Sequence, residues 1–347
     1  MAATMLAERF YTATRQIRLE EVPIPQPGPG QVVIKVAFCG ICQSDLSLIS
    51  GHFPSSLDVV TQGHEASGTI VEVGPGVIGW AEGDRVIPSA GRPCGMCRAC
   101  RRGAFTDCYD LQLMAFAYDG AWAEYHVAQA LGLTRIPDGV DMAQAALLAD
   151  AVSTPFAAVV RTAQVHVGNA VGVWGVGGVG THLVQLAHLA GAVPIIAVDI
   201  NDAALERAKS RGADFTFRSD DPDLGHKIVE ATGGRMIDVA FDAVGIPQTI
   251  RQCIEYLDTN GKAVSVGLSE QEINAGPFLD FNLKRKQLRG HLGYKSQDIA
   301  VLAEMLSYGR LDLSGSISEI VPLSKVTDGI EALVSKRGNP IRILVQP

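Results

Sequence analysis

The chain has 347 residues, of which 47% are hydrophobic and 19% are charged, a composition typical of globular domains rather than disordered segments. Its length predicts about two or three domains, each with its own core. Asp and Glu outnumber Lys and Arg by 37 to 29, and the resulting net charge of −8 argues against nucleic acid or an anionic membrane surface as a main partner. No apolar stretch approaches the ~20 residues of a membrane span.

The beginning of the chain lacks the charged-then-apolar order of a secretory signal peptide, so we expect a cytoplasmic protein with reduced cysteines. Over residues 1–150, short apolar runs such as 31–39, 68–74 and 84–90 are separated by Gly and Pro turns. This pattern predicts an irregular β domain, and the first long amphipathic stretch comes only at about 141–150.

Three residues of this β domain belong to the types that bind zinc. Cys42 lies in GICQSDL, His64 in QGHEASG and Asp150 in LLADAV. A cysteine, a histidine and a carboxylate can hold a catalytic zinc whose fourth position stays open. Each residue alone is weak evidence, because a single histidine is more often a structural one and a cysteine in an apolar stretch usually packs in a core. Cys39 and Cys253 fit that second interpretation.

Four of the seven cysteines lie within fifteen residues, in CGMCRACRRGAFTDC. They are Cys94, Cys97, Cys100 and Cys108. Reduced thiols at two-residue gaps indicate a metal, and four thiolates complete a tetrahedral zinc with no position left for a substrate. We therefore predict a structural zinc site, with chance clustering or redox-active thiols as the alternatives.

The middle of the chain is typical of a dinucleotide-binding βαβ unit. An apolar strand at 170–174 leads into GVGGVG, a helical stretch follows, and a second strand ends at Asp199. Gly175 permits a tight turn, Gly177 lets the backbone approach a pyrophosphate, and Gly180 allows close packing of helix on strand. Asp199 lies where a carboxylate accepts hydrogen bonds from the adenosine ribose and repels a 2′-phosphate, which favours NAD over NADP.

The alternation of strands and helices continues after this unit. Strands are predicted at 215–217, 237–245, 263–267 and 287–293, with helices at 202–212, 223–233 and 247–257. Six strands with crossover helices make a doubly wound parallel sheet, which gives an α/β fold class. The last residues, from about 317, contain a strand, a helix and a final strand that we expect to return to the first domain.

Taken in order, the GHE segment at His64, the four-cysteine lobe, GVGGVG and Asp199 resemble the zinc-dependent medium-chain alcohol dehydrogenases over essentially the whole chain. The resemblance implies a GroES-like domain at 1–152 and 291–347 that carries both zinc sites, and a Rossmann domain at 153–290 that binds NAD. It also implies two zinc ions per chain, one catalytic and one structural, and a homodimer or homotetramer.

The resemblance also assigns roles to single residues. Cys42, His64 and Asp150 match the catalytic zinc ligands, Glu65 a glutamate that can approach the metal, and Asp45 a carboxylate that orients His64. Ser44 matches the hydroxyl that touches the substrate oxygen. The residues matched to the cofactor are Gly175, Gly177, Gly178, Val179, Gly180, Asp199, Thr154, Val244, Val266 and Arg342, the last as a partner of a cofactor phosphate. Surface or strand-edge charges are the alternatives for Asp45 and Arg342.

The implied reaction is reversible hydride transfer between an alcohol and NAD, with zinc polarising the substrate oxygen. Ser44 would pass the alcohol proton outward. Family members often carry a histidine five residues after the first ligand, where this chain has Ser47. We therefore hypothesise a relay in which Ser47 and the cofactor ribose lead to bulk water by way of His52.

The substrate is predicted to be a primary or secondary alcohol, or the matching aldehyde or ketone, with room for a bulky or secondary substrate beside the small residue Ala90. Ala90 lies where family members often have a bulky residue, and Leu113, Phe116 and Trp122 are candidate apolar neighbours. The alternatives are a polyol, sugar or cyclic hydroxyacyl-CoA dehydrogenase of the same fold, or a non-enzymatic NAD-binding protein, which would be expected to lack some of the catalytic residues.

Overall fold

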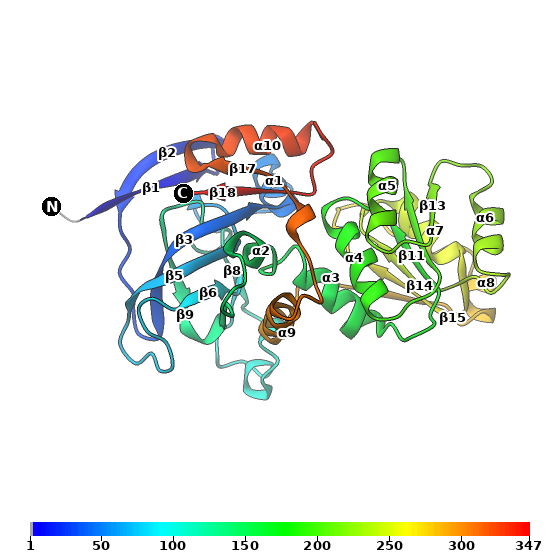
Figure 1. Cartoon of the computed structure of the whole chain (residues 1–347), viewed down its shortest axis with the longest axis horizontal. Helices are drawn as coiled ribbons and strands as arrows, with labels where there is room; N and C mark the ends of the chain where they lie inside the picture. Colours follow the sequence, from blue (N-terminus) through cyan, green and yellow to red (C-terminus); the bar gives the residue numbers. More distant parts are fainter. Residues whose placement is uncertain (1–2) are drawn as a thin grey trace. The chain divides into compact units, whose positions relative to one another are not determined.

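The computed structural model describes residues 3–347, and the chain folds into two compact units (Figure 1). One unit contains the chain up to Ser153 together with Tyr294–Pro347, and the other contains Thr154–Gly293. These boundaries lie one and three residues from the expected ones. Over the residues described, no helix has the length and apolar character needed to cross a membrane.

The first unit is built mainly from strands, joined by short helices. Its strands are β1 (Thr4–Tyr11), β2 (Gln16–Pro23), β3 (Gln31–Ile41), β4 (Val59–Thr61), β5 (Glu65–Val73), β6 (Arg85–Pro88), β7 (Gly91–Arg92), β8 (Gln112–Leu113), β9 (Tyr125–Gln129), β10 (Leu133–Arg135), β17 (Ile317–Pro322) and β18 (Arg342–Gln346). Its helices are α1 (Gln43–Ser50), α2 (Met142–Leu147), α9 (Ser296–Ser307) and α10 (Val326–Val334), with the 3-10 turns η1 (Cys100–Arg102) and η2 (Phe105–Asp107).

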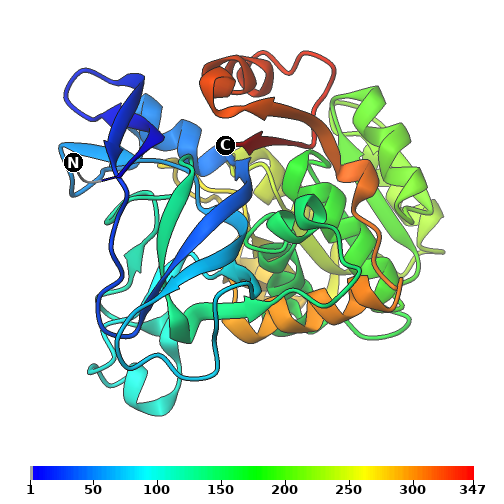
Figure 2. The ribbon, with the colours of Figure 1, turned by 60° about the vertical axis from the view of Figure 1, so that its left-hand side comes forward.

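The long strand β3 organises the main sheet of this unit. The strand order is β10-β6-β5-β3-β18-β17, and β9 also pairs with β3. The C-terminal strand β18 runs antiparallel to β3, with Val345 opposite Cys39, and the two strands lie side by side in both ribbon views (Figures 1 and 2). The predicted strand–helix–strand ending and its return to the first domain are therefore confirmed.

Two helices of this unit were not anticipated. Helix α1 has only eight residues, so its two turns show no readable apolar period. It begins where the Asp45 carboxylate accepts the backbone N–H of Cys42, and it ends at Gly51 in the left-handed conformation. Helix α9 is capped in the same way, by Asp298 accepting the N–H of Lys295.

The second unit is an α/β sandwich around a parallel sheet. Its strands are β11 (Val171–Trp174), β12 (Ile195–Asp199), β13 (Phe215–Arg218), β14 (Ile237–Asp242), β15 (Leu257–Ser265) and β16 (Gln287–Gly290). Its helices are α3 (Ser153–Ala157), which begins at the boundary, the π-helical η4 (Ala158–Ala163), α4 (Gly178–Leu189), α5 (Asp202–Ser210), α6 (Leu224–Ala231), α7 (Pro247–Glu255) and α8 (Phe278–Leu283).

All six predicted strands of the second unit are present, in the order β13-β12-β11-β14-β15-β16, and every pairing is parallel. Central strands such as β11 are buried throughout, which explains their continuous apolar sequences. The largest boundary difference is in β15, which begins at Leu257 rather than at 263 and has an irregular register with β14 between the pairs Ile237–Leu257 and Val239–Lys262. Strands β14 and β16 each end three residues earlier than predicted. The strand order reverses beside β11, where ligands bind in folds of this class.

A buried histidine in the first sheet generates a prediction about acid stability. His126 on β9 is 4% exposed, its Nδ1 lies 3.2 Å from the Gly120 carbonyl, and burial lowers its pKa from 6.5 to about 4. The unfolded chain therefore takes up a proton first as the pH falls, and stability is lost between these two pKa values. From about pH 7 to pH 5 this histidine alone removes about 2 kcal/mol.

We predict that His126→Gln abolishes that share of the acid sensitivity. Urea unfolding of both proteins near pH 7 and near pH 5 measures it, since titrations common to both proteins cancel in the comparison. An identical pH dependence in variant and wild type would contradict the assignment.

Candidate metal and cofactor sites

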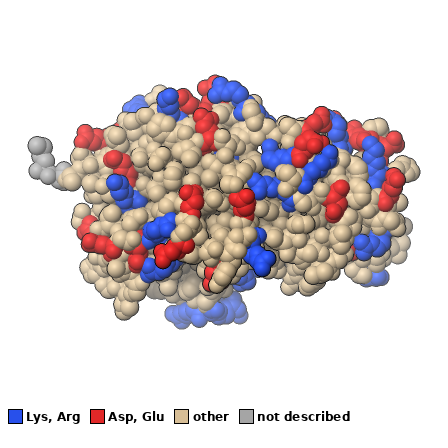
Figure 3. Space-filling view, viewed as in Figure 1, with Lys and Arg blue, Asp and Glu red and all other residues tan. Residues whose placement is uncertain are grey.

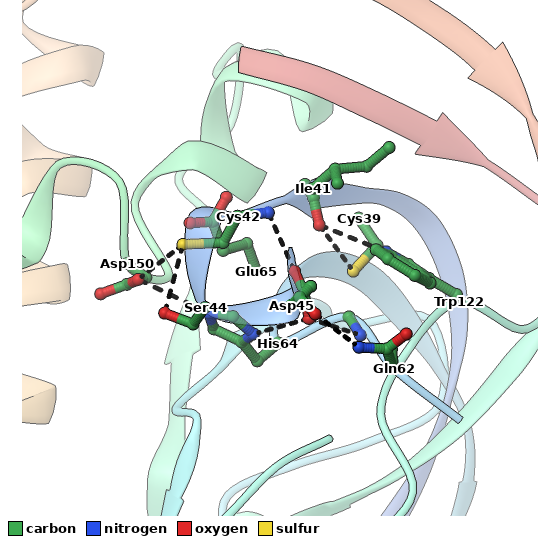
Figure 4. Close-up of polar contacts among 12 residues, drawn as sticks. Cys39, Ile41, Cys42, Ser44, Asp45, Gln62, His64, Glu65, Trp122 and Asp150 are labelled. Carbon is green, nitrogen blue, oxygen red and sulfur yellow. Dashed lines mark hydrogen bonds and ion pairs between the residues drawn. The ribbon is translucent and has the colours of Figure 1, made fainter. Parts of the chain in front are cut away.

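The structure brings Cys42, His64 and Asp150 together at the ends of three elements of the first unit (Figure 4). Cys42 follows β3, His64 directly precedes β5, and Asp150 follows α2. The Cys42 Sγ lies 3.7 Å from Asp150 Oδ2, and the His64 Nε2 lies 3.5 Å from the same oxygen. Glu65 completes a group of four ligand atoms that all lie within 4.8 Å of one another.

These separations fit a zinc ion. With Zn–S near 2.3 Å and Zn–N or Zn–O near 2.1 Å, tetrahedral geometry places the ligand atoms about 3.4 to 3.6 Å apart. The Cys42–Asp150 and His64–Asp150 distances are close to that range. One sulfur, one nitrogen and one carboxylate oxygen form a catalytic type of donor set, because a fourth position remains for a substrate oxygen.

Asp45 holds His64 from the side away from the other ligands. Its Oδ1 lies 3.3 Å from His64 Nδ1, and its carboxylate also accepts the backbone N–H groups of Cys42 and Gly63. Burial by itself lowers the pKa of His64, but the charge of Asp45 and the hydrogen bonds to both aspartates outweigh it and raise that pKa well above 6.5. With Nδ1 directed at Asp45, Nε2 faces the metal position.

Glu65 and Arg342 form a buried ion pair behind the ligands. The Arg342 Nε lies 3.4 Å from Glu65 Oε2, and its Nη1 donates to the Ile41 carbonyl at 2.9 Å. Arg342 is only 4% exposed and Glu65 is fully buried. Burial raises the pKa of Glu65 to about 7, although the charge of Arg342 opposes this. The structure thus gives Arg342 two protein partners, while its role toward a cofactor phosphate stays a prediction.

The three residues of the hypothesised proton relay differ in their surroundings. The Ser44 Oγ lies 3.6 Å from Cys42 Sγ, beside the ligand cluster (Figure 4). The Ser47 hydroxyl donates to the Gln43 carbonyl of the same helix, and His52 Nδ1 lies 2.5 Å from the Ser50 hydroxyl. Ser44 therefore lies beside the predicted metal ligands, and its contact with the substrate stays a prediction, whereas the side chains of Ser47 and His52 are directed at other partners.

Aromatic side chains near the cluster were only partly identified from the sequence. The Phe116 ring lies 6.0 Å from the His64 ring and packs edge-on against Phe53, which the sequence did not single out. Trp122 is fully buried in the core and donates to the Gly40 carbonyl, so it is a core residue. Ala90 is flanked by two phenols. The Tyr294 hydroxyl accepts its N–H at 3.2 Å, and the Tyr118 hydroxyl donates to its carbonyl at 3.4 Å.

The four clustered cysteines form a second group of ligand atoms. Their sulfurs are separated by 3.6 Å (Cys97–Cys100), 3.9 Å (Cys97–Cys108) and 4.0 Å (Cys94–Cys100). Thiolates around a tetrahedral zinc lie about 3.8 Å apart, whereas a disulfide needs about 2.05 Å. All four thiols are free, so the lobe fits a structural zinc and no disulfide.

Electrostatics in this lobe favour thiolates at two of the four positions. Backbone N–H groups of Cys100 and Tyr109 lower the pKa of Cys97 to about 6, and those of Met96 and Cys97 lower the pKa of Cys94. Exposed basic side chains gather over the lobe in the space-filling view (Figure 3), and its arginines are Arg98, Arg101 and Arg102. Their charge would offset the negative charge of a zinc–tetrathiolate centre.

The second unit presents the predicted cofactor residues at one sheet edge. The glycine turn follows β11, Asp199 ends β12, Val244 follows β14, and Val266 follows β15. Parallel strands all present their carboxyl ends at the same edge. Gly178 and Val179 form the first turn of the twelve-residue helix α4, whose positive end suits a pyrophosphate.

The turn itself fits a dinucleotide. A Cβ at Gly180 would lie 1.7 Å from the Gly175 carbonyl oxygen, so only glycine allows this approach of helix to strand. A Cβ at Gly177 would meet nothing within 4 Å, which leaves that side open for a ligand. The Asp199 carboxylate is fixed by the backbone N–H groups of Val176 and Asn201.

Thr154 is held by a residue that the sequence did not reveal. The His291 Nε2 lies 3.0 Å from the Thr154 carbonyl, and its Nδ1 lies 2.9 Å from the Thr162 hydroxyl. His291 thus braces the segment that contains α3 and the π-helical turn. It was expected only as a strand residue, because a sequence separation of 137 positions hides this contact.

We predict that Cys97→Ser lowers the zinc content from about two ions per chain to about one, because a serine hydroxyl is a poor replacement for a zinc-bound thiolate. Metal analysis of the dialysed protein measures the loss, and a fall in melting temperature should accompany it. Cys253→Ser, at a buried cysteine outside both clusters, is the matched control and should retain both ions. Retention of two ions by Cys97→Ser would exclude the lobe as a zinc site.

Comparisons with known families agree with this geometry. Residues 28–138 match the alcohol dehydrogenase GroES-like domain, and residues 178–307 match the zinc-binding dehydrogenase domain. The sorbitol dehydrogenase of Halalkalibacterium halodurans is 30% identical over 341 residues, which cover 96% of each chain. The (R,R)-butanediol dehydrogenase of Bacillus subtilis is 30% identical over 99% of this chain and 100% of its own.

A solved reductase structure has a similar fold over the whole chain. Acetophenone reductase from Geotrichum candidum, in complex with NAD, superposes with a TM-score of 0.87 at 26% identity, over all of this chain and 98% of its own. The predicted fold class, a GroES-like domain plus a Rossmann-like parallel sheet, is confirmed. With its two zinc-type ligand clusters and its NAD-type glycine turn, the chain belongs to the zinc-dependent alcohol dehydrogenase family of medium-chain dehydrogenases.

Proposed function

We propose that the protein catalyses reversible oxidation of small, largely apolar primary or secondary alcohols to aldehydes or ketones with NAD. The observation that carries the proposal is the Cys42–His64–Asp150 cluster with the Ser44 hydroxyl 3.6 Å from Cys42 Sγ and the Phe116 ring 6.0 Å from His64. It combines three metal ligands, a proton-carrying hydroxyl and an apolar neighbour.

The bound groups would supply Lewis-acid polarisation of the substrate oxygen and a nicotinamide that exchanges hydride with the carbon. The chain's own residues do the positioning. Cys42, His64 and Asp150 would hold the metal, while Asp45, 3.3 Å from His64 Nδ1, leaves His64 Nε2 free to face it. During oxidation Ser44 would accept the alcohol proton while passing its own hydroxyl proton on toward water, and during reduction the reverse transfer would neutralise the alkoxide.

A polyol or sugar is the second candidate substrate. The carboxylate at Asp150 favours it, because polyol enzymes of this family commonly have a carboxylate as third ligand. The sorbitol and butanediol dehydrogenases that match over nearly the whole chain favour it as well. The complete four-cysteine lobe and the Phe116–Phe53 pair favour the simple alcohol. A cyclic hydroxyacyl-CoA has no observation in its support.

A substrate panel distinguishes the two classes. We expect kcat/KM for 2-butanol and benzyl alcohol to exceed that for sorbitol by about tenfold or more, since desolvating hydroxyl groups against phenyl rings is costly. NADH-coupled absorbance measures each rate, and the reaction with NADP is run alongside. Higher kcat/KM with sorbitol would replace the simple alcohol with a polyol as the proposed substrate.

We predict that Ser44→Ala lowers kcat about 100-fold, because the proton then lacks a positioned carrier. Ser44→Thr keeps a hydroxyl and should recover most of the rate, while zinc content stays the same in both variants. Steady-state kinetics with metal analysis tests this. If Ser44→Ala keeps the wild-type kcat and pH profile, proton transfer follows another route.

We also propose that the protein is a homodimer or homotetramer. Six large apolar residues lie exposed on the second unit, near its edge strand β16 in sequence: Leu268, Ile273, Phe278, Leu279, Leu283 and Leu292. Exposed apolar side chains and an unpaired strand edge both favour association. Light scattering should give two or four chains per particle, and Phe278→Asp with Leu283→Lys should dissociate them. A wild-type monomer at micromolar concentration would contradict the proposal.

We further propose that the protein is located in the cytoplasm, because its cysteines are free thiols rather than disulfides.

A further inference from the structure

An arginine of α5 holds the glycine turn from behind. The Arg207 Nη2 donates to the Val176 carbonyl at 3.1 Å, and its Nε lies 3.4 Å from the Thr181 Oγ1. The Thr181 hydroxyl donates to the same carbonyl at 2.9 Å. The carbonyl oxygen of Val176 therefore accepts two hydrogen bonds, one from a charged donor, which uses both of its lone pairs.

These bonds determine which way the next amide points. The Val176 carbonyl and the Gly177 N–H belong to one planar trans peptide group, so they point in opposite directions. Arg207 and Thr181 hold the carbonyl, and the Gly177 N–H is then directed away from both of them. The space at the Cβ position of Gly177 is open, and α4 begins at the next residue. This amide thus joins the helix N-terminus as a donor for an anion.

The other side of Val176 is fixed as well. Its backbone N–H donates to Asp199 Oδ2 at 2.7 Å, and the Asp199 Oδ1 accepts the N–H of Asn201 at 2.9 Å. Reversing the 176–177 peptide would break the two bonds to its carbonyl. It would also turn a carbonyl oxygen toward the position of the cofactor phosphates, where like partial charges repel.

We propose that Arg207 is a positioning residue for the cofactor: it holds the 176–177 peptide so that the Gly177 N–H faces the pyrophosphate of NAD. Arg207 acts through its contacts with Val176 and Thr181 in the turn. The inference is independent of which alcohol is oxidised, because it concerns only the binding of the dinucleotide.

Binding measurements on the zinc-loaded protein test the proposal without any turnover. The variants are Arg207→Met, which removes the donors, and Arg207→Lys, which keeps the charge. Lys209→Met on the same helix is the matched control, since Lys209 is exposed and its ammonium group pairs with Glu206 on that helix. NADH affinity is followed by fluorescence titration, and ADP-ribose and adenosine are measured as competitors.

Arg207→Met is expected to raise the Kd for NADH and for ADP-ribose about tenfold or more, the cost of losing a charge-assisted hydrogen bond. Adenosine lacks the pyrophosphate, so its Kd should change by less than about twofold. Arg207→Lys should fall between wild type and Arg207→Met, and Lys209→Met should bind like wild type.

Two results would overturn the proposal. One is an NADH affinity in Arg207→Met within about twofold of the wild type. The other is an equal loss for adenosine, because the arginine would then act through Asp199 on the ribose. If Arg207→Met does not fold, Thr181→Val removes the second donor to the same carbonyl. Unchanged NADH binding in both Thr181→Val and Arg207→Lys would then contradict the role.

Discussion

Hydrogen bonding between β3 and its neighbours β5 and β18 is the constraint on which the metal site depends. The pairing sets Gly40 opposite Glu65, and Ile343 opposite Ile41. It thereby brings the residue after β3, the residues at the start of β5 and the first residue of β18 to one place. Cys42, His64, Glu65 and Arg342 are neighbours in space for this reason, although 300 residues separate the first from the last. A shift of either strand by one residue would reverse the side chains and disperse the cluster.

The residues directly behind the metal ligands are held in place by electrostatic interactions. Asp45 and Glu65 are buried carboxylates, and each has a defined cationic or hydrogen-bonding partner: Asp45 accepts two backbone N–H groups and faces His64, while Glu65 faces Arg342. Unpaired, such groups would be costly to bury. These contacts keep the ligand atoms in place. The negative charge of the Cys42 thiolate and the Asp150 carboxylate can then be balanced by a metal ion, which is consistent with a preformed metal site.

Much of this could be predicted from the sequence, because the strongest signals are local. Central strands of the parallel sheet such as β11 and β12 are short apolar runs, the glycine turn is six residues long, and the four-cysteine lobe spans fifteen. The contacts that were missed join distant residues. His291 braces Thr154, Arg207 holds Val176, and Tyr294 meets Ala90. Nothing in the periodicity of a single segment encodes such pairs, since they form only when the fold brings distant helices, strands and loops together. The short helix α1 was missed because two turns carry too little pattern.

The central claim is that the chain binds two zinc ions with different donor sets, one of four thiolates and one of a single thiolate with nitrogen and oxygen. Zinc-edge X-ray absorption of the purified protein tests it most directly, since it measures the mean number of sulfur ligands per bound zinc ion. Five thiolates shared by two ions predict about 2.5 sulfur ligands per zinc, together with a shell of nitrogen and oxygen near 2.0–2.1 Å. One zinc per chain surrounded by four sulfurs would show that Cys42, His64 and Asp150 do not form a metal site.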